Sequence, residues 1–272
     1  MSYSAIILAD SVPDGYPLSR LVTMQVTFPR FILAEFNTHR VFSRNSASSR
    51  AIPVETRLRQ VRENPFVPEA FGVNRRGMQA SETLDERDGS KARDVWLAAR
   101  DAACEQVERM LDLGVHKQHA NRLLEPFVWH TVVVSSTAWA NFFALRCHPA
   151  AQPEMQITAR AMRAAYEAST PTLLRESQWH LPYVSAADPA DLSYMLKLSV
   201  VRCAAVSYER QDIERERSQV TERYEQMHRM GHWSPFEHQA MIAPGMCDSN
   251  FAAPWWQFRK QFEGEAVFVE GT

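Results

Sequence analysis

The run from Ser43 to Arg50, SRNSASSR, combines groups that bind anions. Serine hydroxyls and backbone N–H groups donate hydrogen bonds to phosphate or carbonyl oxygens. Arg50 adds a rigid fork that holds two such oxygens at once, which a lysine cannot do. The run is too rich in serine for a core element, so we expect a loop. Taken alone, a serine-rich turn that caps a helix explains it equally well.

Two further arginines, Arg122 and Arg146, flank the apolar run Val132–Val134, which predicts a short strand. A guanidinium that faces inward beside such a strand needs a partner to offset the cost of its burial, and a phosphate or a ring oxygen of a ligand would serve. For each arginine taken alone, a surface position or a salt bridge is the favoured interpretation. A third polar segment, GHWSPFEH (Gly231 to His238), is also compatible with a helix end followed by a packed Pro-Phe corner.

The sequence predicts neither a metal site nor a cysteine nucleophile. His116 and His119 stand three apart on an expected helix, but a third ligand is not evident. The four cysteines are far apart without a CxxC pair, which indicates reduced thiols. Cys147 precedes His148, and a cysteine beside a histidine superficially matches a nucleophilic cysteine site. Neighbours in sequence are not thereby paired in space, so we do not favour this interpretation.

The expected fold class is α+β, rich in helices. Val22, Met24, Val26 and Phe28 alternate with polar residues, which predicts a half-buried strand over 21–28. A helix is expected from Pro29 through FILAEFNTHR, and Ser135 or Ser136 is expected to cap the helix STAWANFFALRC. We expect irregular surface structure over 81–94 and a linker over 185–191. Further helices are expected over 92–113, 116–126, 153–168, 192–208 and 211–230.

Composition narrows the class of protein. The chain has 272 residues, 45% hydrophobic and 23% charged, with a formal net charge of −2. That charge gives no basic footprint for nucleic acid or an anionic membrane, so we expect neither partner. No apolar run is long enough to span a membrane and no signal peptide is apparent, so the expected location is cytoplasmic.

Three segments together resemble the flavin-dependent thymidylate synthases. In THRVFSRNSASSR, the residues His39, Arg40, Asn45, Ser48 and Arg50 fit the family's R-H-R signature, and PRFILAEFN before it resembles the family's strand-to-helix transition. In the segment from Asn121 to Arg146, the matches to R-x-x-x-P and N-F-x-x-L-R are Arg122, Pro126, Asn141, Leu145 and Arg146. GHWSPFEH is close to the family's G-H-x-[ST]-P-F-E-H, and RCAAVSYER (Arg202 to Arg210) resembles an alanine-rich family segment.

The order of these segments differs from that of the family, in which SPFEH precedes the HR signature. We interpret the difference as a circular permutation of a single domain, 1–272, with the old ends joined near 185–191, since termini often lie close together at a domain surface. The resemblance implies an α+β fold with a small antiparallel or mixed sheet. It also implies a homotetramer with active sites shared between subunits.

The resemblance further implies reductive methylation of dUMP at C5 to dTMP, with FAD, NADPH and methylenetetrahydrofolate. Because the flavin carries the carbon and the hydride, no covalent protein nucleophile is needed. The catalytic residues by this likeness are Arg146, Arg50 and Ser48. The residues expected to bind substrate are Glu35, Ser48, Ser49, Arg50, Arg122 and Arg146. The residues expected to bind cofactor are His39, Arg40, Asn45, Ser135, Asn141, His238 and Arg259.

Three positions depart from the family pattern. Thr38 replaces the first arginine of R-H-R, Ser46 replaces an acidic residue, and Ala150 replaces a frequent histidine. Loss of the Thr38 cation weakens the expected flavin phosphate site, and Arg259 and Lys260 in the tail are candidates to compensate. These departures leave open C5 hydroxymethylation, methylation of another pyrimidine nucleotide, and a catalytically silent nucleotide-binding homologue.

Overall fold

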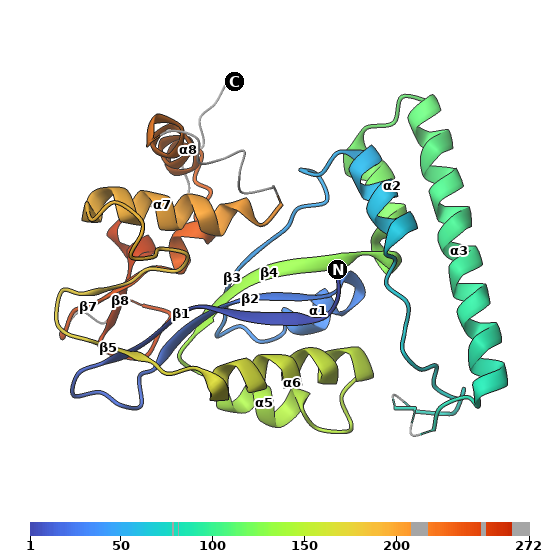
Figure 1. Ribbon diagram of the computed structural model, residues 1–272, viewed down its shortest axis with the longest axis horizontal. Helices are drawn as coiled ribbons and strands as arrows, with labels where there is room; N and C mark the ends of the chain where they lie inside the picture. Colours follow the sequence, from blue (N-terminus) through green and yellow to red (C-terminus); the bar gives the residue numbers. More distant parts are fainter. Residues whose placement is uncertain (78, 81, 208–216, 246–248, 263–272) are drawn as a thin grey trace.

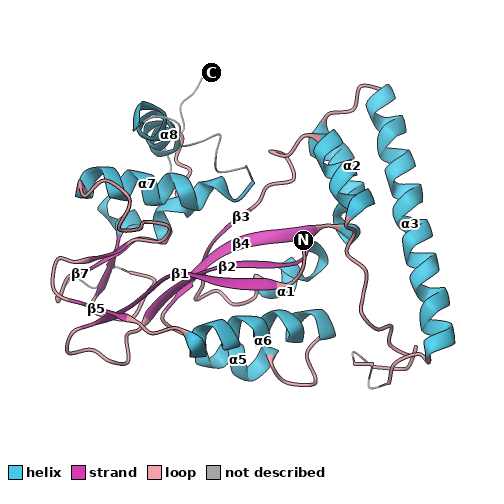
Figure 2. Ribbon diagram, in the orientation of Figure 1, coloured by secondary structure: helices cyan, strands magenta, loops and turns pink. Residues whose placement is uncertain are grey.

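A five-stranded mixed sheet forms the centre of the protein (Figures 1 and 2). The computed structural model describes residues 1–77, 79–80, 82–207, 217–245 and 249–262. The sheet order is β3-β4-β2-β1-β5, in which β5 runs parallel to β1 and the other neighbours are antiparallel. The strands are β1 (Ser4–Pro13), β2 (Leu21–Pro29), β3 (Ser43–Ser46), β4 (Trp129–Ser136) and β5 (Thr172–Leu174).

The predicted strand over 21–28 is confirmed as the central strand β2, but it is buried on both faces rather than one. Val22, Met24, Val26 and Phe28 pack against α5 (Ala140–Arg146) and α6 (Pro153–Ala168). On the opposite face Thr23 is fully buried, because a segment around β6 (Trp179–His180) lies across it and supplies hydrogen-bond partners. A polar residue is tolerated in a core when its hydrogen bonds are made.

Two smaller bodies pack at opposite ends of the sheet (Figure 1). At one end are α2, α3, α4 and η2, which share an apolar cluster around Leu58, Val107 and Leu124. At the other end the antiparallel sheet β6-β7-β8 is covered by α7 and α8, around Val201, Val220 and Phe236. The first set comprises α2 (Val54–Glu63), α3 (Glu86–Asp112), α4 (Lys117–Ala120) and η2 (Asn121–Phe127). The second set comprises β7 (Ala240–Ile242), β8 (Trp255–Gln257), α7 (Leu192–Ala204) and α8 (Arg217–Arg229).

Most predicted helices are present, with shifted ends. The helix predicted over 153–168 is confirmed as α6, and that over 192–208 ends at Ala204, followed by η3 (Ala205–Ser207). The segment after Pro29 forms only η1 (Arg30–Ile32) and α1 (Leu33–Phe36). The helix predicted over 211–230 begins within the described residues at Arg217, and its predicted start lies outside them. None of the described helices is both long and apolar enough to cross a membrane.

Three local predictions were wrong. Residues 43–46 form an edge strand rather than a loop, because their backbone pairs with residues 132–135 of β4. Residues 86–94 are helical rather than irregular, because Asp85 caps α3 by accepting a hydrogen bond from the backbone N of Asp88 (2.8 Å). Ser135 and Ser136 end β4 rather than cap α5, which begins later at Ala140.

Candidate functional site

Arg146, in the last turn of α5, joins three residues of the segment that follows β2. Its Nη1 forms an ion pair with Glu35, its Nη2 donates to Oγ1 of Thr38 (3.0 Å), and its Nε donates to Nε2 of His39 (2.8 Å). A guanidinium has five N–H donors, so two remain for a ligand. The side chain is 18% exposed, and hydrogen bonds to a developing charge are stronger in such a partly desolvated position.

His39 fixes the direction of this guanidinium. The imidazole is buried, lies edge-on to the ring of Phe142 (centroids 4.9 Å apart) and stacks on Phe42 (5.7 Å). Burial, then the nearby Arg146 and Arg44, lowers the pKa of His39 below its usual value. A neutral ring whose Nε2 accepts from Arg146 carries its proton on Nδ1. His39 therefore acts as an acceptor at this position.

Glu125, in η2, organises a second group of predicted residues. Its Oε1 accepts from Oγ of Ser49 (2.9 Å) and from Nη1 of Arg122 (2.6 Å), and it lies 3.5 Å from Nη2 of Arg30. Arg30 also contacts the imidazole of His130, whose pKa burial lowers to about 3. One carboxylate thus serves two guanidinium groups, which leaves net positive charge beside the serine-rich loop.

Asn121 holds the backbone of this loop. Its buried Nδ2 donates to the carbonyl oxygens of Ser49 (2.8 Å) and Ile52 (2.9 Å). Ser48 and Arg50, by contrast, are exposed, and Oγ of Ser48 accepts from the backbone N of Arg50 (3.3 Å). The loop therefore presents Ser48 and Arg50 outward from a fixed backbone.

The segment containing GHWSPFEH lies against β3, although nearly two hundred residues separate them in the chain. Oγ of Ser234 donates to Oδ1 of Asn45 (3.0 Å), and Nδ2 of Asn45 donates to the carbonyl oxygen of Cys203 (2.7 Å). This is the juxtaposition that a circular permutation of the family's chain order requires.

Charged side chains gather beside this motif. Burial raises the pKa of Glu237, while the nearby Arg259, Lys260 and Arg44 act in the opposite direction. The guanidinium of Arg259 lies 4.3 Å from the ring centroid of Trp233, within the range of a cation–π contact. Arginine side chains in such a position can bind an anionic group such as a phosphate.

A chain of buried hydroxyl and imidazole groups links the two sheets. Oγ of Ser135 lies 2.8 Å from Nδ1 of His238 and 2.6 Å from Oγ1 of Thr23, which in turn lies 2.8 Å from Nε2 of His180. The chain ends at Oγ of Ser11, 2.9 Å from Nδ1 of His180. Burial lowers the pKa of both histidines to about 3. They are therefore neutral, and they hold β2, β4, β6 and the SPFEH segment together.

Most of the predicted site residues therefore lie in four groups: around Arg146, around Glu125, at the Asn45–Ser234 contact, and in the buried chain that contains Ser135 and His238. In the described part of the chain, the Arg146 group and the Glu125 group are each held by their own set of hydrogen bonds. Arg40 and Asn141 are exposed and make no side-chain hydrogen bond or ion pair with the described residues. Sequence reasoning missed Arg30, Asn121 and Glu125. Only Glu125 had a signal, because it stands three residues after Arg122, the spacing of a helical ion pair.

Neither alternative chemistry gains support. Among the described residues, no group of three or more His, Cys, Asp and Glu side chains is placed to hold a metal ion. Burial raises the pKa of the Cys147 thiol, whereas a nucleophilic cysteine needs a lowered pKa.

Comparisons with known proteins identify the family and the fold. The sequence model of a family described as thymidylate synthase complementing proteins matches residues 20–172, more than half of the chain. Two solved structures of the UMP/dUMP methylase PolB from Streptomyces cacaoi, bound with 5-Br UMP and with 5-Br dUMP, have a similar fold. Each is 19% identical over 61% of this chain, with a TM-score of 0.50, and the match covers 88% and 90% of those chains. No curated protein matches the chain.

Proposed function

Because the chain belongs to the thymidylate synthase complementing protein family, we propose that it methylates dUMP at C5 to give dTMP. The proposed reactants are methylenetetrahydrofolate as carbon donor and NADPH as reductant, with FAD as the cofactor. The observation that carries the proposal is the guanidinium of Arg146, which Glu35, Thr38 and His39 hold in place while two of its N–H donors stay available.

Arg146 is the proposed partner of the pyrimidine ring. C5 must act as a nucleophile toward the carbon donor, so the ring must take on enolate character with negative charge on a carbonyl oxygen. A preorganised guanidinium stabilises that charge without having to reorient. His39 stays neutral and keeps the N–H groups of Arg146 directed at the pyrimidine ring. A second cation in place of His39 would repel Arg146 and weaken this alignment.

Ser48, Arg50 and Arg122 are the proposed phosphate site. The loop backbone is fixed by Asn121, and the excess positive charge around Glu125 favours a dianion. By the resemblance to the family, we propose that the site is shared between subunits of a homotetramer, to which different subunits contribute this group and the Arg146 group.

The flavin is proposed to lie against the SPFEH segment, and when bound it would carry the folate-derived carbon and deliver the hydride. Arg259 and Arg44, which lie near Glu237, are the proposed contacts of its phosphates. His39, Arg40, Asn45 and Asn141 complete the proposed set. Ser135 and His238 are fully buried, so their contribution is to hold the SPFEH segment on the sheet.

A second substrate deserves a direct comparison because the solved structures of similar fold are those of a methylase of both UMP and dUMP. On this alternative the protein methylates UMP, or both nucleotides. The two substrates differ at the ribose 2′ position and share the ring and the phosphate, so the roles of Arg146 and Arg50 are the same in both.

The test is the absorbance spectrum of purified protein mixed with FAD, followed by titration with dUMP and with UMP. We expect flavin bands that shift when the preferred nucleotide binds, and a loss of the nucleotide shift in Arg146→Gln with flavin binding kept. Arg163→Gln, an exposed helix position paired only with Glu167, is the matched control. If no flavin binds but the nucleotide does, a silent nucleotide-binding protein replaces the proposal.

A further inference from the structure

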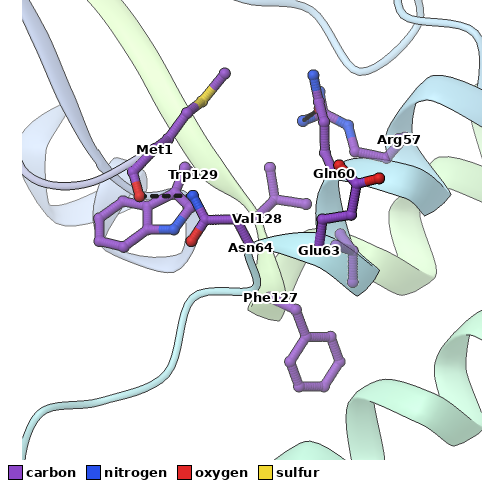
Figure 3. A pocket seen from close by; sticks show the side chains of 9 residues that line it. Met1, Arg57, Gln60, Glu63, Asn64, Phe127, Val128 and Trp129 are labelled. Atoms are coloured by element: carbon purple, nitrogen blue, oxygen red, sulfur yellow. Dashed lines mark hydrogen bonds between the residues drawn. The ribbon is translucent and has the colours of Figure 1, made fainter.

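A cavity lies between α2, the start of β4 and the N-terminal residues (Figure 3). Its volume is about 190 Å³, far above the roughly 10–15 Å³ that one water molecule needs. None of the residues assigned above to nucleotide or flavin lines it. The cavity is therefore separate from the proposed nucleotide and flavin sites.

Arg57, on α2, is the cationic side chain that lines this cavity (Figure 3). Its side chain belongs to a residue only 5% exposed, and its one hydrogen bond among the described residues runs from Nη1 to Oε1 of Gln60 (3.1 Å). Glu63 also lines the cavity, but it is exposed and forms no ion pair with Arg57 in the described part of the chain. A buried cation without an anionic partner is costly, because its desolvation is not offset.

The surroundings do not neutralise this charge. Burial, then repulsion from Arg30, lowers the pKa of Arg57 to about 10, while Glu125 acts in the opposite direction. Arg57 is therefore still protonated at neutral pH. Glu125 already pairs with Arg30 and Arg122, so three guanidinium groups share one carboxylate. The region carries an excess of positive charge that an anion would offset.

The remaining wall is apolar and aromatic. Val61, Phe127, Val128 and Trp129 line it, and the indole of Trp129 also packs edge-on against Tyr3 (centroids 5.1 Å apart). The indole Nε1 of Trp129 is buried without a hydrogen-bond partner in the described part of the chain. Both the cation and the unpaired N–H are donors, so the ligand that completes this wall is an acceptor.

We propose that this cavity is a second ligand site, which binds a small organic anion. The oxyanion, a carboxylate or a phosphate monoester, lies on Arg57 and Gln60, and the apolar part lies against Phe127 and Trp129. This site is distinct from the proposed nucleotide site, and its occupancy does not depend on the proposed reaction.

The test measures binding of four probes to the full chain by calorimetry: benzoate, phenyl phosphate, and their neutral counterparts benzamide and benzyl alcohol. We expect the anions to bind and to raise the melting temperature, since a ligand that binds only the folded state stabilises it. Comparison of the affinities for benzoate and phenyl phosphate shows whether the site prefers a carboxylate or a phosphate monoester. Saturating dUMP should leave benzoate binding unchanged, which separates this site from that of the nucleotide.

Arg57→Gln should raise the dissociation constant of the preferred anion by about tenfold or more, since a charge-assisted hydrogen bond is lost. Arg59→Gln, on an exposed position of the same helix, is the matched control and should bind as wild type. Arg57→Met is the second variant, because an apolar side chain of similar length removes the buried charge without leaving an unpaired group. Undiminished anion binding by both Arg57 variants overturns the proposal. So does absence of anion binding by the wild type, as expected if a carboxylate of another subunit covers Arg57.

Discussion

Arg146 and Thr38 show how a departure from a family pattern can be accommodated at a single position. Where an arginine is expected, Thr38 supplies a hydroxyl that accepts a hydrogen bond from Arg146. A second guanidinium there would compete for Glu35, which already pairs with Arg146. Sequence reasoning singled out both His39 and Arg146, but their hydrogen bond joins residues 107 apart in the chain, and only the folded sheet reveals it.

Arg146→Lys tests whether the planar geometry of the guanidinium contributes to catalysis in addition to its charge. Lysine keeps the positive charge but cannot bond Glu35, Thr38 and His39 in one plane, so the ammonium is not aimed at the ring. We expect kcat/KM to fall by about 10²–10³, as for loss of one preorganised charge-stabilising donor. Steady-state kinetics beside Arg163→Lys, at an exposed position, measure the effect. A variant with wild-type kcat/KM would remove Arg146 from the proposed catalytic role.

Arg259→Ala tests compensation for the cation that Thr38 lacks. The guanidinium of Arg259 is held over Trp233 and stands among the cations around Glu237, which we assign to the flavin phosphates. We expect flavin affinity to fall by about tenfold, by loss of a charge-assisted contact. Equilibrium dialysis or fluorescence titration of FAD gives the value, with Arg229→Ala at the exposed end of α8 as control. Unchanged flavin affinity would show that Arg259 does not compensate.

At the scale of elements, hydrophobic periodicity predicted the central strand β2 and the helix α6, since both have one strongly apolar face. Hydrophobic periodicity failed where tertiary contacts determine the secondary structure. The serine-rich run 43–46 became a strand only because β4 offered a free edge. The small strands β6, β7 and β8 were not predicted, because strands of two or three residues are too short to show an alternating pattern.

Asn121→Ala tests how η2 positions the serine-rich loop. The substitution leaves the buried carbonyl groups of Ser49 and Ile52 without their donor, so we expect a loss of about 1–3 kcal/mol in the free energy of unfolding. The loop should also become less ordered, so KM for the nucleotide should rise more than kcat falls.

Denaturant unfolding and steady-state kinetics measure the two effects. Asn141→Ala, at an exposed position on α5, is the control for stability. A proportional fall in kcat with KM unchanged would contradict the positioning role of Asn121.

At the scale of the whole molecule, the buried chain from Ser11 to His238 ties the N-terminal sheet to the C-terminal segment. The SPFEH segment reaches β3 through tertiary contacts, which is compatible with the proposed circular permutation. Both Asn45 and the SPFEH segment were singled out in the sequence by the resemblance, whereas no sequence motif indicated the polar chain through Thr23 and His180.

Stability should fall as the solution is acidified, because His130, His180 and His238 have folded-state pKa values of about 3 against 6.5 for a free histidine. A lowered folded-state pKa means that the unfolded chain binds more protons in the interval between the two values. The free energy of unfolding therefore decreases as pH falls below about 6.5, by up to ~1.4 kcal/mol per pH unit for each histidine.

His180→Asn should reduce the dependence of the free energy of unfolding on pH by the contribution of one histidine, ~1.4 kcal/mol per pH unit. Urea unfolding at several pH values between about 4 and 7, an interval that includes the free-histidine pKa of about 6.5, measures the slope. His119→Asn, at an exposed position, should leave the slope unchanged. Equal slopes for wild type and His180→Asn would show that the buried imidazole is not held neutral.

The most direct measurement of the central proposal is the mass of the nucleotide product. The protein is incubated with FAD, NADPH, dUMP and methylenetetrahydrofolate labelled with ¹³C at the transferred carbon, and the nucleotide is analysed by mass spectrometry. We predict a labelled product heavier than dUMP by one CH2 group, with the methyl on C5, and no product with Arg146→Gln. A hydroxymethylated product, or unchanged dUMP with flavin and nucleotide both bound, would contradict the proposed methylation.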